Sequence, residues 1–423
     1  MNGVLSAVTH PSRHRISQTR VQELHVGIAP PKCHTSPVPP SPPSLTLTND
    51  LRTLLAPTSY ACTSLTQLPG GTTSFVFLGT LATPLLFTSP CGTETIETQV
   101  VVKHAAPFAS CHTEFLVDAG RVKYESAMLA ALTSFGDEET NVDVEIKVKV
   151  PKLYLYDEEA RVLVIQYISS TIALHTALNY LSIAEADRVG RALGTWLLRV
   201  HVWCEEREHA ELKEMLGGNE EEVELKWKLT WGQVTEVLDR LGDVVGKDER
   251  EAWDAAKDRA WEEKQMRRRL RTGVVHGDFW AGNILIPTPF PVPDQTKSLQ
   301  LHVIDFEFSH LAPLSTDLAS FLGSLLERHY ISATPLPSIK TLLTAFLAGY
   351  GPCSEDMKRR TLFQTGVFVV NWWSRGPPGR KDVDAETRRR GTELVRMGVR
   401  WVKGGWESDH TVVRGTALEG QVR

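Results

Sequence analysis

The sequence lacks the cysteine spacing of a metal site or a disulfide scaffold. Its cysteines are scattered along 423 residues without one C-x-x-C pair. This pattern argues against a zinc site and against a dense disulfide framework, and a reducing, cytoplasmic setting fits it best. The six cysteines are Cys33, Cys62, Cys91, Cys111, Cys204 and Cys353.

Long apolar runs and an excess of positive charge are also missing. No run approaches the roughly 18 apolar residues that span a bilayer, and the N-terminus lacks the apolar stretch of a secretory signal. The first 22 residues carry Arg13, Arg15 and Arg20 but no acid, which fits a disordered tail or an organelle transit peptide. The formal charge of -5 offers no positive field for nucleic acid or for an anionic membrane, so neither is expected as a partner.

What is present is the composition of a globular protein. Apolar residues make up 42% of the chain and charged residues 23%, so a sizeable core can be buried. Seven prolines lie between Pro30 and Pro43, a composition that favours extended chain. We therefore predict a disordered, proline-rich tail over 1–48 and a flexible C-terminus over 411–423.

The rest of the chain changes pattern near residue 168. Residues 49–168 predict a β-sheet with one helix, and residues 169–410 predict a mainly helical lobe, so the fold class is α+β. The helical pattern is clearest where Val189, Leu193, Trp196 and Val200 share one helix face. Strands are predicted over 74–81, 84–88, 98–103, 142–150, 152–156, 161–167, 274–276, 284–286 and 299–304, and the sheet lobe's helix over 118–133.

One loop carries a pattern suited to phosphoryl transfer. Asp278 and Asn283 lie five residues apart between two apolar strands, and Asp305 ends the next strand. Asp278 could accept a hydroxyl proton from an acceptor molecule, while the oxygens of Asn283 and Asp305 suit Mg²⁺ on the phosphates of ATP.

These motifs resemble the aminoglycoside phosphotransferase and choline kinase superfamily. That family has a catalytic loop of the form H-G-D-x-x-x-x-N and a metal loop reading I-D-F/W-E, and both occur here, at 276–283 and 304–307. The resemblance covers about 50 to 405 and implies a two-lobed protein-kinase-like fold. It implies an ATP- and Mg²⁺-dependent kinase of a small-molecule hydroxyl, with Asp278 as catalytic base and Asn283 and Asp305 as magnesium ligands.

The same resemblance implies residues that bind the nucleotide. A glycine turn before the first strand would face the phosphates, although such a turn is often only a turn. Lys103 would contact the α- and β-phosphates, and Glu125 would pair with Lys103, with Glu114 as the alternative. The segment 164–168 would be the hinge against adenine. The turn residues are Gly70, Gly71, Thr72, Thr73 and Ser74, and the hinge residues are Gln166, Tyr167 and Ile168.

Several other polar and aromatic residues have structural interpretations. His201 is expected to be a satisfied structural histidine, and His276 to brace the catalytic loop. Asp317 is expected to cap a helix, while its placement also resembles a family position that supports the loop. Four tryptophans fill a core or line a substrate pocket. They are Trp372, Trp373, Trp401 and Trp406.

Two other functions compete with a small-molecule kinase. A pseudokinase would keep the fold and nucleotide binding without transfer, which the intact acid, amide and metal carboxylate disfavour. A protein kinase is disfavoured because Asp305 is followed by Phe-Glu-Phe, without the glycine of D-F-G. The acidic stretch 205–224 fits a cationic acceptor or a solvated helix face.

Overall fold

The computed structural model describes residues 45–69, 71–88, 94–135, 146–241, 245–266, 272–288, 299–334, 336–375 and 383–414, with 416 and 418. All of them belong to one compact unit, Lys32–Arg423. Within these ranges, no helix is both long and apolar enough to cross a membrane.

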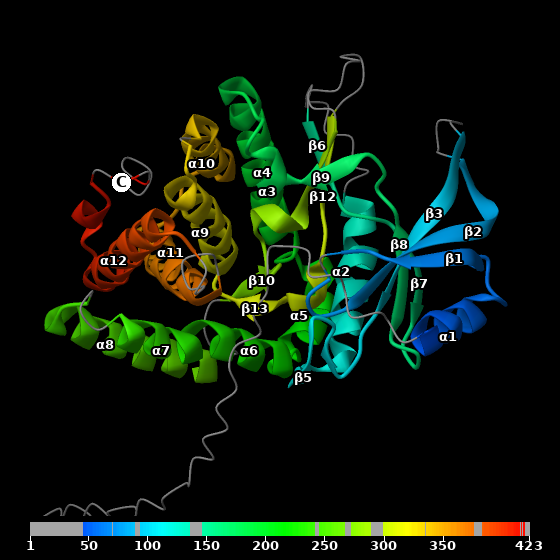
Figure 1. The fold of residues 1–423 in the computed structure, drawn as a ribbon, viewed down its shortest axis with the longest axis horizontal. Coiled ribbons are helices and arrows are strands. Elements are labelled where there is room, and N and C mark those ends of the chain that lie inside the picture. Colours follow the sequence, from blue (N-terminus) through cyan, green and yellow to red (C-terminus); the bar gives the residue numbers. More distant parts are fainter. Residues whose placement is uncertain are drawn as a thin grey trace, which may run out of the picture. The chain divides into compact units, whose positions relative to one another are not determined.

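The first half of this unit is built on a five-stranded antiparallel sheet. Its order is β1-β2-β3-β8-β7, as seen at the right of Figure 1. Helix α1, Leu45–Leu55, packs Leu51 and Leu55 into the same apolar cluster as Phe77 and Val100 of the sheet. Residues 45–48 are therefore helical and not part of the predicted tail, whose residues 1–44 lie outside the described ranges. The strands are β1 Cys62–Gln67, β2 Phe75–Thr88, β3 Glu94–His104, β7 Leu153–Asp157 and β8 Val162–Gln166.

Two details of this sheet differ from the prediction. The strands predicted over 74–81 and 84–88 form one strand, β2, which has a register shift between Thr80 and Leu85. Proline cannot donate to the ladder, and the irregular pairing accommodates it. Strand β1 was not predicted, since its sequence is polar and only Cys62 is buried.

Helix α2, Val122–Phe135, covers this sheet and confirms the helix predicted over 118–133. It follows a short 3₁₀ turn, Ala119–Arg121, and buries Met128, Leu129 and Leu132. A small hairpin of β4, Phe108–Ala109, and β5, His112–Leu116, precedes it.

A second sheet, with order β6-β12-β11-β9, carries the segments beside the predicted catalytic loop. Strand β6, Ile146–Lys149, pairs in parallel with β12, Leu299–Val303. It does not join the first sheet, although the sequence placed it there. Strands β11, Ile284–Pro287, and β9, Thr171–Ala173, complete this sheet. Strands β10, Gly273–Val275, and β13, His310–Ala312, form a separate pair.

The remaining chain is mainly helical, so the predicted α+β class is confirmed. Helices α4 and α10 cross so closely that a Cβ on Gly194 would collide with the carbonyl oxygen of Phe346. Figure 1 shows α6, α7 and α8 along one edge, with α9, α11 and α12 beside them, and α8 runs back past the end of α6. The helices are α3 Leu174–Ala177, α4 Ile183–Trp203, α5 Ala210–Gly217, α6 Glu220–Trp227, α7 Gln233–Arg240, α8 Lys247–Met266, α9 Ser315–Ile331, α10 Pro337–Tyr350, α11 Glu355–Arg375 and α12 Ala385–Glu407. Shorter turns are Arg207–His209, a π-helix Lys228–Gly232, Ala281–Asn283, Phe306–Phe308 and His410–Val413.

Candidate functional site

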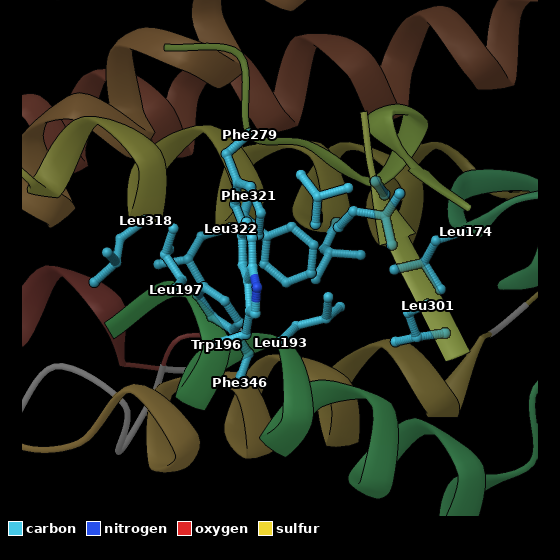
Figure 2. Packing of buried hydrophobic residues seen from close by; sticks show 14 of the residues in the cluster. Leu174, Leu193, Trp196, Leu197, Phe279, Leu301, Leu318, Phe321, Leu322 and Phe346 are labelled. Carbon is cyan, nitrogen blue, oxygen red and sulfur yellow. The ribbon is translucent and has the colours of Figure 1, made fainter. Parts of the chain in front are cut away.

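The loop between β10 and β11 is anchored in the core on both sides of Asp278. Gly277 has a φ of +79°, which glycine adopts without strain, and a side chain there would collide with the carbonyl oxygen of Phe308. Phe279 is fully buried, stacks on Trp196 and packs at a tilt against Phe321 in the helical core (Figure 2). The carboxylate of Asp278, which lies between Gly277 and Phe279 in the sequence, is thereby held at the edge of the core.

The two carboxylate oxygens of Asp278 accept hydrogen bonds from different partners. Lys226 of α6 donates from Nζ to Oδ1 at 2.7 Å, and Asn283 donates from Nδ2 to Oδ2 at 2.9 Å. The Asp278 side chain is still 32% exposed, so an acceptor molecule can approach it. The predicted base and the predicted amide ligand are therefore in direct contact.

The ladder between β11 and β12 brings Asn283 next to the second predicted metal ligand. Ile284 pairs with Val303, and the N–H of Ile304 donates to the carbonyl of Asn283 at 3.0 Å. This register places Asn283 opposite Ile304, the residue that precedes Asp305. The Asn283 amide nitrogen also donates to the carbonyl of Asp278 at 3.0 Å, which leaves its side-chain oxygen for another partner. One carboxylate and one amide oxygen are hard donors that fit Mg²⁺.

Lys103 bridges the two sheets at this point. Its Nζ lies 2.7 and 2.8 Å from the carboxylate oxygens of Glu125 on α2 and 2.7 Å from Oδ1 of Asp305. The structure thus pairs Lys103 with Glu125, while the alternative, Glu114, is exposed on β5. Oxygens of Glu125, Asp305 and Glu307 lie within 4.8 Å of one another. That spacing could hold a cation, and here the ammonium of Lys103 contacts Glu125 and Asp305, while Glu307 pairs with Arg121.

Charge and burial act against each other in this cluster. Burial raises the pKa of the Glu125 carboxyl, and the adjacent Lys103 opposes that effect. Burial would also raise the pKa of Asp305, but Lys103 outweighs it and holds that pKa below its usual value. The two carboxylates raise the pKa of Lys103 against the effect of burial, so this lysine stays charged. Asp305 also has a φ of 72°, an uncommon backbone conformation for a residue with a side chain.

His276 braces the loop, as predicted. Its Nδ1 accepts from the backbone N–H of Asp278 at 3.2 Å, and its Nε2 lies 3.0 Å from the carbonyl of Ile304. Only a neutral ring protonated on Nε2 satisfies both contacts. Burial lowers the pKa of His276, which favours that neutral form. The ring therefore ties the catalytic loop to the metal loop.

Asp317 supports the same loop from helix α9, and its predicted role as an N-cap is wrong. The N-cap position of the helix is Leu314, which forms no side-chain cap, and Asp317 is fully buried in the first turn. Its oxygens accept from the backbone N–H groups of His276 and Gly277 at 2.8 and 3.0 Å. The competing prediction, support of the loop, matches these contacts.

His201 completes this support and confirms its prediction as a satisfied structural histidine. Its Nε2 lies 3.1 Å from Oδ2 of Asp317, and its Nδ1 lies 2.9 Å from the hydroxyl of Tyr350. Burial would raise the pKa of Asp317, but the contacts with His201 and the loop hold it below its usual value. The carboxylate that orients the loop is thus kept ionised.

A fully buried ion pair joins the glycine turn to the metal loop. Arg121 Nε donates to Glu307 Oε2 at 3.1 Å, and both side chains are completely buried. The hydroxyl of Ser74 donates to Glu307 Oε2 at 2.9 Å, and that of Thr73 donates to Oε1. Both hydroxyls are therefore engaged by protein, and their contact with phosphate stays a prediction. Gly71 is partly buried and Thr72 exposed, while Gly70 lies outside the described residues.

The predicted hinge connects the two sheets. Gln166 ends β8, and Tyr167 and Ile168 lead to β9 of the second sheet. The Gln166 amide donates to Glu97 at 3.0 Å, and its side chain lines a pocket of about 280 Å³. That pocket is lined by none of the catalytic or metal-loop residues, so it is separate from this site. It is lined by Thr95, Glu97, Leu132, Thr133, Phe135, Val148, Lys149, Val150, Lys152, Gln166, Trp196, Gln300 and His302.

Two of the four tryptophans, which were predicted to fill a core or line a substrate pocket, pack in apolar clusters. Trp401 is fully buried in the helical core, which confirms the core interpretation for this residue, and Trp406 packs on a neighbouring cluster. The side chains of Trp372 and Trp373 lie outside the described part of the structure.

The sequence predicts no role for Lys226 or Arg121. Glu307 appears there only as the glutamate of the metal-loop motif. The position of Glu307 in the metal loop is a signal that could have found it. Lys226 and Arg121 stand 52 and 186 residues from their partners Asp278 and Glu307, and no local pattern marks them.

Glu222 of α6 provides a prediction about stability and pH. It is fully buried, and no described residue donates to either carboxylate oxygen. Burial, and then the charge of Glu307, raises the pKa of Glu222 to about 8. The folded protein must therefore hold a proton that the unfolded chain releases near pH 4.5. Between about pH 4.5 and 8 the folded state therefore binds one more proton than the unfolded chain. The contribution of Glu222 to the free energy of unfolding falls as pH rises through this range.

We expect Glu222→Gln to stabilise the protein at alkaline pH. A glutamine is neutral at every pH, so the variant should match the native protein near pH 5 and exceed it by about 2 to 4 kcal/mol at pH 9. Urea unfolding at both pH values measures the difference. A constant offset at the two pH values would contradict the raised pKa of Glu222.

Comparison with known proteins gives consistent matches. Residues 114–363 match the model of the phosphotransferase enzyme family. Phosphotransferase FrzJ of Cladobotryum sp is 30% identical over 338 residues, which cover 75% of this chain and 82% of that protein. A 4-hydroxytryptamine kinase of Psilocybe cubensis is 26% identical over 285 residues, covering 65% and 73%. Among solved structures, the GDP complex of aminoglycoside 2'-phosphotransferase-IIIa is 13% identical, with a TM-score of 0.47 over 86% of this chain and 99% of that one.

Proposed function

Because this chain belongs to the phosphotransferase enzyme family, we propose that it transfers the γ-phosphoryl group of ATP to a hydroxyl group of a small molecule. The observation that carries this proposal is a chain of contacts: Asn283 bonds to Asp278 and lies beside the metal loop in the β11–β12 ladder, and Asp305 of that loop pairs with Lys103. A proton acceptor, two oxygen donors and a lysine are the parts that phosphoryl transfer requires.

Each residue has one task in this reaction. Asp278 orients the acceptor hydroxyl and takes its proton as the new O–P bond forms. Lys103, held by Glu125, contacts the α- and β-phosphates of the nucleotide. Asn283 and Asp305 would hold Mg²⁺, which would neutralise negative charge on the phosphate oxygens.

The name of one relative suggests which class of acceptor to test. The name of one relative, 4-hydroxytryptamine kinase, specifies an aromatic hydroxyl on a molecule that also carries an amine. Amino sugars and choline-like amines combine a hydroxyl with a cation in the same way. The acceptors worth testing first are therefore hydroxylated amines, followed by sugars and methylthioribose.

The experiment is an ADP-release screen over these acceptors at saturating Mg²⁺, with Asp278→Asn as the blank. Acceptor-dependent ADP release that disappears in the variant supports the proposal. Release that is undiminished in the variant removes Asp278 from its task. Nucleotide binding without ADP release on any acceptor would favour a pseudokinase.

A further inference from the structure

The cation on Asp278 comes from a helix outside the catalytic and metal loops. Lys226 Nζ lies 2.7 Å from Asp278 Oδ1, while Asn283 occupies Oδ2. Both oxygens of the proposed base are thus engaged before any acceptor arrives. A carboxylate oxygen has two lone-pair sites, so a hydroxyl that arrives at Oδ1 would share this oxygen with Lys226 unless the lysine moves away.

Helix α6 is fastened in place, so this contact belongs to the framework of the site. At its N-terminus, the Asn219 amide donates to the carbonyl of Ser309, next to the metal loop, at 2.9 Å. At its C-terminus, the Trp227 ring packs against Trp261 of α8 with centroids 4.8 Å apart. Lys226 lies between these two anchors.

The lysine side chain itself has room to exchange partners. Its Nζ lies 4.2 Å from the centre of the Phe308 ring. An aromatic ring attracts a cation, so this contact can stabilise the ammonium both before and after it leaves Asp278. The side chain is 24% exposed, and Asp278 is 32% exposed. An ion pair at such a site is only partly desolvated and can break when a stronger anion competes.

The transferred phosphoryl group is that stronger anion, and the other described cations of the site already have partners. The catalytic loop 276–283 contains no lysine or arginine. Arg121 donates to Glu307, to Ser74 and to three backbone carbonyl groups, and Lys103 is paired with Glu125 and Asp305. Lys226 is the cation that contacts Asp278 among the described residues.

The reach of Lys226 is sufficient for this task. An attacking hydroxyl lies about 2.6 to 3.2 Å from the oxygen of its base, and its phosphorus target about 3 to 3.5 Å further. An ammonium that already touches Oδ1 of Asp278 is therefore one side-chain rotation from the phosphoryl oxygens.

We propose that Lys226 is a phosphate-binding residue that leaves Asp278 for the γ-phosphoryl oxygens when ATP binds. The inference rests on the proposed function above and adds a second lysine to it. The exchange frees Oδ1, which accepts the hydroxyl proton while the O–P bond forms. The bond from phosphorus to the bridging oxygen breaks, and ADP leaves with the electron pair. Base activation is thereby coupled to the presence of the γ-phosphate.

A binding experiment tests this exchange without requiring turnover. The Mg²⁺ complexes of a non-hydrolysable ATP analogue and of ADP are titrated into native protein, Lys226→Met and Lys228→Met. Lys228 is the matched control, because it lies two residues away and is 67% exposed. We expect Lys226→Met to weaken the analogue about 10- to 100-fold and ADP less than about twofold, since only the analogue has a γ-phosphate. Lys228→Met should change neither affinity.

Equal effects on both nucleotides, or none, would overturn the proposal. Lys226→Arg keeps the charge and should retain most of the preference for the analogue, and thermal melting of each variant identifies loss of fold. With an acceptor from the screen, Lys226→Met should lower kcat at least about 100-fold and change the acceptor KM less than about threefold. A higher kcat would show that Lys226 only blocks the base. Absence of transfer by the native protein refutes the proposed function alone, because the binding preference is measured separately.

Discussion

Asp278→Asn is expected to lower kcat for phosphoryl transfer by about 100- to 10,000-fold, with nucleotide affinity within about threefold of the native value. Asparagine keeps the shape of the side chain and one oxygen that can accept from Lys226. It cannot take a proton from the acceptor hydroxyl. The loss should therefore appear in the chemical step, because Lys103 stays paired with Glu125 and Asp305 and can still bind the nucleotide.

Steady-state kinetics with an acceptor from the screen measures this effect, and titration with ADP measures the nucleotide affinity. Asp258→Asn is the matched control, because Asp258 is exposed on α8 and the same change there should leave kcat within about twofold. A kcat for Asp278→Asn within tenfold of native would exclude Asp278 as the base. A parallel loss of ADP affinity would indicate that the loop had moved instead.

The parts of the site that sequence could predict are those fixed by local spacing. Asp278 and Asn283 share one loop between short apolar strands, and β10, β11 and β12 lie within one or two residues of their predicted bounds. The family match confirms the predicted resemblance, and the sheet-rich and helical halves confirm the predicted two-lobed kinase-like fold. Local sequence determined these features because a strand, a loop and their polar ends are neighbours along the chain.

The contacts that sequence could not predict join residues far apart in the chain. Glu307 meets Thr73 across 234 residues, and Lys226 meets Asp278 across 52. Such pairs depend on how helices and sheets pack against one another. The hydrophobic periodicity of the sequence predicts local secondary structure and not this packing. Asp317 illustrates the same limit, because local sequence predicts a helix cap while its carboxylate accepts from a loop 40 residues earlier.

Asp317→Asn is expected to give the largest loss of stability, about 3 to 5 kcal/mol in the free energy of unfolding. The native carboxylate accepts two backbone N–H groups of the catalytic loop on separate oxygens, and His201 as well. An amide has one oxygen and one NH₂ group, so one loop N–H would face another donor. A buried donor without an acceptor costs about 1 to 3 kcal/mol by itself, and the lost charge adds to that.

Urea unfolding at pH 7 measures this loss, with Asp187→Asn as the matched control. Asp187 forms an exposed ion pair with Arg191 on α4, so its replacement should cost less than about 1 kcal/mol. The effect of Asp317→Asn should also depend on pH. Because the pKa of Asp317 is held below its usual value, its stabilisation is complete above about pH 4 and is lost as pH falls through the lowered pKa. The two proteins should therefore converge in acid, whereas a difference that persists there would show that shape, and not charge, is what Asp317 contributes to the loop.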